Sequence, residues 1–122
     1  MHPRAKQLTE EDVIFTLECL EEHTPVRGNA MASGDNEADR ACENEILERL
    51  DRGDIWAWCT VKVTARYGSL VGVDYLGCCS YRDERDFREP SGGYFDDMRR
   101  EALRDLQSQI DTLAPLVCDC DE

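Results

Sequence analysis

The alternation of apolar and polar residues is most regular between residues 54 and 67, where an apolar side chain occupies every second position. A period of two is typical of a β-strand with one buried face. The segment "VGVDYLGCCSY" follows after the short turn "YGSL", so the two segments are predicted to form an antiparallel hairpin. Gly72 and Gly77 in the second strand indicate a bulge or the close approach of another backbone.

The two faces of the first strand differ in the size and polarity of their residues. One face carries small and β-branched residues, which suit packing under helices, so this face is predicted to be covered. It consists of Ile55, Ala57, Cys59, Val61, Val63 and Ala65. The opposite face carries Trp56, Trp58, Thr60, Lys62, Thr64 and Arg66.

Apolar residues at helical spacing predict a helix over residues 9–22 and a second helix that ends near Arg52. In the first, Thr9 is the expected N-cap, with Asp12 completing a capping box. The second begins at Asp35 or Ser33, and Gly53 is the residue just past its end. The two apolar stripes consist of Val13, Ile14, Leu17 and Leu20, and of Cys42, Ile46, Leu47 and Leu50.

A third helix is predicted over residues 94–113, with Pro115 as its stop. The order α-α-β-β-α then describes a small α+β domain, in which the helices pack on one face of an antiparallel, hairpin-based sheet. A chain of 122 residues suits a single domain. The expected limits are a flexible arm over residues 1–8, the domain over residues 9–117 and an acidic tail over residues 118–122.

The balance of charge narrows the choice of partner. The chain has 27 acidic and 14 basic side chains, for a net charge of −13. Direct binding of nucleic acid is disfavoured because phosphates require clustered lysines and arginines, and an acidic membrane surface is disfavoured for the same reason. A basic groove of another protein is the complementary partner. The alternative is that the charge only maintains solubility.

The acidic residues are expected to gather on the first two helices, whereas the third alternates in sign. Asp97, Arg100, Glu101 and Arg104 are spaced to pair with one another. The predicted partner-binding carboxylates are those of Glu11, Glu18 and Glu22 on the first helix and of Glu37, Glu45, Glu48 and Asp51 on the second. Carboxylates one helical turn apart are spaced at roughly 5–6 Å, close to the repeat of backbone phosphates.

Trp56 and Trp58 need a cover, because a solvated face rarely carries two such side chains. One possibility is that the loop over residues 23–34, the loop over residues 82–93 or the N-terminal arm folds over them. The other is that they contact a partner or a second copy of the chain, since tryptophan is common in binding hot spots.

Residues for catalysis are sparse, so no enzyme and no cofactor is expected. The two histidines, His2 and His23, belong to no nucleophile pattern, and no phosphate-binding loop is present. The seven cysteines include no C-x-x-C pair, and an odd number suggests reduced thiols. A zinc site remains a less favoured alternative; it would use Cys78, Cys79, Cys118 and Cys120. No apolar leader or membrane-length stretch is visible, which favours the cytoplasm.

The strings "PVRGNAMASGD", "RGDIWAWCTVKV", "VDYLGCCSY" and "GGYFDDMRREAL" resemble a group of small uncharacterised proteins encoded in bacteriophages and prophages. The resemblance covers roughly residues 25–107 and supplies no catalytic residues. It implies expression in a host bacterial cytoplasm, and by analogy of size and charge an anti-CRISPR-like inhibitor of host defence. The leading hypothesis is a non-enzymatic protein that occupies the basic groove of a defence complex. The alternative is a phage structural protein that dimerises through its tryptophan-bearing sheet face.

Overall fold

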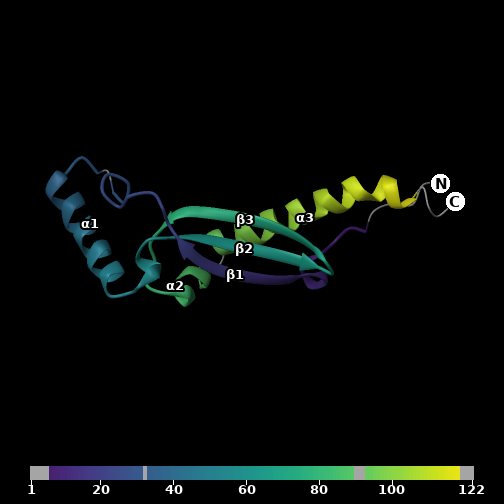
Figure 1. Cartoon of the computed structure of the whole chain (residues 1–122), viewed down its shortest axis with the longest axis horizontal. Coiled ribbons are helices and arrows are strands. Elements are labelled where there is room, and N and C mark those ends of the chain that lie inside the picture. Colours follow the sequence, from purple (N-terminus) through teal and green to yellow (C-terminus); the bar gives the residue numbers. More distant parts are fainter. Residues whose placement is uncertain (1–5, 32, 90–92, 119–122) are drawn as a thin grey trace. The chain divides into compact units, whose positions relative to one another are not determined.

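The computed structural model describes residues 6–31, 33–89 and 93–118, with side chains as far as residue 113. It contains three α-helices and a three-stranded antiparallel sheet, which confirms the α+β class. The strands are β1 (Ile14–Glu21), β2 (Cys59–Tyr67) and β3 (Leu70–Cys79), and they run side by side in that order (Figure 1). The helices are α1 (Asn36–Asp51), α2 (Glu84–Arg88) and α3 (Tyr94–Cys118).

The predicted element order was wrong at its start, because residues 9–22 form no α-helix. Thr9 and Asp12 do form a cap, in which Thr9 N donates to Asp12 Oδ2 at 2.8 Å, but the cap begins only a 3-10 turn, Glu10–Asp12. The chain then enters strand β1, where exposed and half-buried residues alternate. The aromatic Phe15 and the β-branched Ile14 and Thr16 fit a pleated strand. The apolar residues of this segment fit both a helical and a strand period, and pairing with β2 selects the strand.

Two element boundaries also differ from the predicted ones. The strand predicted from residue 54 begins only at Cys59, because a 3-10 turn, Ile55–Ala57, precedes it. Ile55 is accordingly 40% exposed rather than covered. Helix α3 continues to Cys118, so Pro115 does not stop it. A proline within a helix removes one backbone donor and crowds the preceding turn, and it can kink a helix without ending it.

The described contacts divide the chain into two compact units, each of which combines distant segments. The first unit joins residues 1–17, 63–74 and 94–122. Its core forms where α3 lies against the sheet: Val63, Ala65, Ala102 and Leu106 are fully buried. Gly72 confirms the predicted close approach, since a Cβ atom there would lie 2.2 Å from the carbonyl oxygen of Ala102.

The second unit joins residues 18–62 and 75–93, and α1 is its main helix. Its core contains Val26, Ile46, Ala57 and Trp58, so the inner face of α1 is buried as its apolar stripe predicted. The short helix α2 also belongs to this unit, and its Phe87 is 2% exposed. The expectation of one continuous domain over residues 9–117 stays a prediction.

Candidate interaction surface

The ends of helix α1 are fixed by local signals that were read correctly from the sequence. Asp35 is the N-cap, and its carboxylate accepts hydrogen bonds from the backbone N–H groups of Glu37 and Ala38, each at 3.1 Å. Gly53 follows the C-cap with a φ of +85°, a left-handed conformation that glycine adopts without strain. Arg49 donates to Asp54 at 2.8 Å and so ties the last turn to the following segment.

The outer face of α1 carries carboxylates that have no basic neighbour bound to them. We call Glu37, Glu45, Glu48 and Asp51 the α1 acidic stripe; all four are exposed. None of the four side-chain carboxylates is linked by a hydrogen bond or an ion pair to another described residue. The predicted carboxylates on the second helix therefore lie together on one surface, and no described residue forms an ion pair with them.

The outer charges of α3 are arranged differently, as their alternation predicted. Asp97 pairs with Arg100, and Glu101 pairs with Arg104 at 2.8 Å. A third pair of the same i,i+3 type joins Asp96 and Arg99 at 2.5 Å. These pairs cancel charge on the surface of α3, which makes α3 a poor attractor for a basic partner.

The other three predicted carboxylates share no helix face. Glu11 lies in the first 3-10 turn and Glu18 in β1, and both are exposed. Glu22 is half-buried, and its carboxylate accepts from the backbone of Cys78 at 2.6 Å, from the backbone of Thr24 and from the hydroxyl of Thr60. These bonds, led by the one from Cys78, lower the pKa of Glu22 to about 2. Glu22 therefore holds chain segments together.

Trp58 is covered by the chain itself, the first of the two predicted possibilities, whereas Trp56 is covered only in part. Trp58 is 4% exposed, lies in the core with Val26 and Ile46, and donates from Nε1 to the carbonyl of Thr24 at 2.7 Å. Trp56 is half-buried, with its ring 5.8 Å from that of Phe87. Neither lies on an open sheet face: Trp56 belongs to a 3-10 turn, and Trp58 precedes β2.

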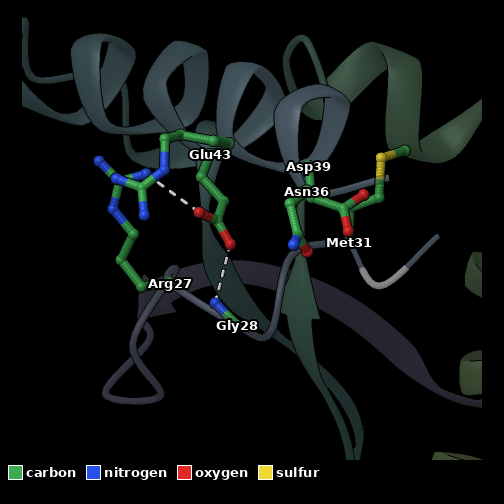
Figure 2. Close-up of a pocket in the computed structure, with 7 residues that line it drawn as sticks. Arg27, Gly28, Met31, Asn36, Asp39 and Glu43 are labelled. Atoms are coloured by element: carbon green, nitrogen blue, oxygen red, sulfur yellow. Dashed lines mark hydrogen bonds and ion pairs between the residues drawn. The ribbon is translucent and has the colours of Figure 1, made fainter. Parts of the chain in front are cut away.

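A cavity of about 430 Å³ lies between the glycine-rich loop over residues 27–31 and α1 (Figure 2). Glu43 is one of the residues that line it: one carboxylate oxygen accepts from Arg27 at 3.0 Å and the other from the backbone of Gly28 at 2.8 Å. These two bonds, with that from Gly28 the larger cause, lower the pKa of Glu43. Asp39 holds the loop further along by accepting from the Ser33 hydroxyl at 2.6 Å.

The cavity was missed by the sequence analysis, although one signal was present. Glu43 lies between Cys42 and Ile46 on the inner side of α1, and an acidic residue there needs a partner. Arg27 supplies it (Figure 2). Since both oxygens of Glu43 are already bound, the arrangement fixes the loop rather than offering a free carboxylate to a ligand.

Two thiols of the second unit, those of Cys59 and Cys79, are buried. Cys59 and Cys79 are 0% and 4% exposed, and burial raises the pKa of both thiols, that of Cys79 to about 11. A thiol that stays protonated is a weak nucleophile and a weak ligand. Within the described residues no group of histidine, cysteine or carboxylate side chains could hold a metal ion. The side chain of Cys118 and the whole of Cys120 lie outside the described part, so the zinc alternative stays a prediction.

Among the helices that the structure describes, none is both long and apolar enough to span a membrane. Comparison with known proteins gave no relatives: no family model matches the chain, and no match was found among curated proteins or solved structures.

Proposed function

We propose that this chain is a non-enzymatic interaction protein that binds a basic surface of another protein through the α1 acidic stripe. The observation that carries the proposal is the contrast in pairing: the stripe has four exposed carboxylates without partners, whereas α3 neutralises its own. Exposed charge of one sign raises the rate at which a complementary partner is captured.

The partner that fits this stripe best is a nucleic-acid-binding protein. Carboxylates one turn apart on a helix are spaced at roughly 5–6 Å, which approaches the spacing of backbone phosphates. A groove lined with lysine and arginine would therefore accept α1 in place of its nucleic acid. We extend the proposal to a phage-type inhibitor of a host defence complex in the bacterial cytoplasm, with competition as its mechanism.

The test begins with the tagged protein and a lysate of phage-susceptible bacteria, from which retained proteins are identified. We then expect the purified target to release labelled nucleic acid when this protein is added, as measured by fluorescence anisotropy. Release should weaken as salt rises, because screening reduces attraction between exposed charges. A target that binds no nucleic acid would contradict the competitive mechanism.

The charge-reversal variant Glu45→Lys/Glu48→Lys/Asp51→Lys is expected to abolish this competition. Its matched control is Glu10→Lys/Glu11→Lys/Glu18→Lys, which makes the same change of net charge at exposed positions outside α1. Competition that survives in the control and fails in the first variant assigns the contact to the α1 acidic stripe. Equal loss in both variants would show that only overall charge matters and would reject the stripe.

A further inference from the structure

The two edges of the sheet differ in how their backbone groups are satisfied. Part of the edge formed by β3 is covered by α3: Asp105 accepts from Val73 N at 2.9 Å, and Gln109 Nε2 donates to the carbonyl of Val71 at 2.7 Å. In an edge strand, every second residue directs its backbone N–H and C=O groups away from the sheet. Asp105 and Gln109 lie one helical turn apart on α3, so their side chains reach two successive residues of this outward-facing set. A further strand could pair with Val71 and Val73 only by displacing these two side chains.

The opposite edge, β1, has no such cover. No side chain among the described residues makes a hydrogen bond to the backbone of Ile14–Glu21. The strand also lacks lysine and proline, two residues that commonly protect an edge from pairing. Ile14, at its start, is 66% exposed, the highest value among the exposed large apolar side chains of the described residues.

We propose that the free edge of β1 pairs with β1 of a second copy of this chain, in an antiparallel two-fold arrangement. This pairing is independent of the proposed function, because it concerns β1 rather than α1 and depends on main-chain hydrogen bonds rather than on attraction between opposite charges. Antiparallel pairing supplies main-chain hydrogen bonds to the outward groups of β1, and it continues the sheet across the two copies.

Among the registers centred on Thr16, Leu17 and Glu18, the sequence of β1 favours the one centred on Leu17. When a two-fold axis through the sheet relates the two β1 strands, residues that face each other lie on the same side of the sheet only if their residue numbers differ by an even number. With Leu17 facing Leu17 of the second copy, Ile14 faces Leu20 and Thr16 faces Glu18, so no carboxylate faces another. A register centred on Glu18 sets two carboxylates against each other, and one centred on Thr16 sets Ile14 against Glu18. The register centred on Leu17 also covers the exposed Ile14.

The experiment is sedimentation equilibrium of the full chain over a range of concentrations, at low and high salt. We expect a concentration-dependent dimer that tightens with salt, because each copy carries a net charge of −13. Thr16→Glu places a new carboxylate opposite Glu18 at two positions in the dimer. It should therefore raise the dissociation constant of the dimer roughly tenfold. Adding Glu18→Lys to that variant should restore it, because each new carboxylate then faces a lysine.

The matched control is Ser69→Glu, which adds the same charge at an exposed position in the turn between β2 and β3. Because Thr16 is exposed, its variant is expected to keep the wild-type circular dichroism spectrum. A monomer at every concentration would overturn the proposal. So would equal weakening by Thr16→Glu and Ser69→Glu, or a double variant that stays as weak as Thr16→Glu alone.

Discussion

Helices α1 and α3 both present acidic residues to solvent, but only α3 matches them with arginines. On α3 each of Asp96, Asp97 and Glu101 has an arginine three residues further on. On α1 the members of the acidic stripe have no partner among the described residues. Exposed pairs contribute only about 0.2–0.5 kcal/mol each, so pairing changes the surface potential more than the stability. The comparison teaches that exposed carboxylates remain unpaired on α1, whereas exposed carboxylates on α3 are paired with arginines.

The inner faces of these helices explain why their outer faces are free to differ. Helix α3 is held by buried Ala102 and Leu106, and by the close approach to Gly72. Helix α1 is held by Ile46 against Trp58. Because apolar burial anchors both helices, neither needs its outer charges for folding, and those charges can serve recognition.

The largest expected effect comes from removing the anchor of α1. Trp58→Ala should lower the free energy of unfolding by about 3–5 kcal/mol, because it leaves a cavity in the core of the second unit. Trp58→Phe keeps most of the ring but loses the hydrogen bond to Thr24, and should cost less. Urea denaturation followed by circular dichroism measures both. Trp58→Ala with wild-type stability would show that α1 is held by something other than this core.

The next-largest expected effect distinguishes Glu22, whose carboxylate stabilises the fold, from the carboxylates of the α1 acidic stripe. The pKa of Glu22 is lowered from 4.5 to about 2, chiefly by the hydrogen bond from Cys78. A lowered pKa in the folded state means stabilisation that is complete above pH 4.5 and is lost as the pH falls towards 2. Glu22→Gln should therefore be less stable than the wild type at neutral pH, with the difference shrinking in acid.

Urea midpoints measured from neutral pH down to about pH 2 test this expectation, since the midpoint reports stability when the slope is unchanged. Glu48→Gln is the control, because it removes a carboxylate of the stripe that binds no described residue. Its midpoint should follow that of the wild type. A Glu22→Gln variant that also follows the wild type would show that Glu22 contributes no more to folding than the stripe does.

The parts of the structure that depend on nearby residues were predictable from the sequence. Asp35 and Gly53 mark the ends of α1 within one turn, and the period of two identified the hairpin of β2 and β3. The exposed carboxylates of α1 followed from these limits. Strand β1 was missed because "VIFTLECL" has apolar residues that fit both periods, and only its pairing with β2 selects the strand.

The roles that depend on distant residues could not be predicted in the same way. Glu22 accepts a hydrogen bond from a residue 56 positions away, and Trp58 donates to one 34 positions away. Nothing in the local sequence distinguishes Glu22 from Glu18, which stays exposed. The covering of the tryptophans was likewise open until the segments around Thr24 and Phe87 were placed beside them.

The smallest effect is the most direct test of the comparison between α1 and α3. Glu101→Ala removes one member of an ion pair with Arg104, and should lower the free energy of unfolding by about 0.2–0.5 kcal/mol at low salt. Glu45→Ala removes a carboxylate that lies one turn from Glu48, and should leave stability unchanged or raise it slightly by relieving repulsion. Both replacements introduce the same residue at an exposed helical position, so the helix propensity of alanine affects them alike. The difference between the variants should shrink as salt screens exposed charge, which thermal unfolding at two salt concentrations can measure. If both variants lose the same stability, the stripe is paired in solution and the contrast between the two helices does not hold.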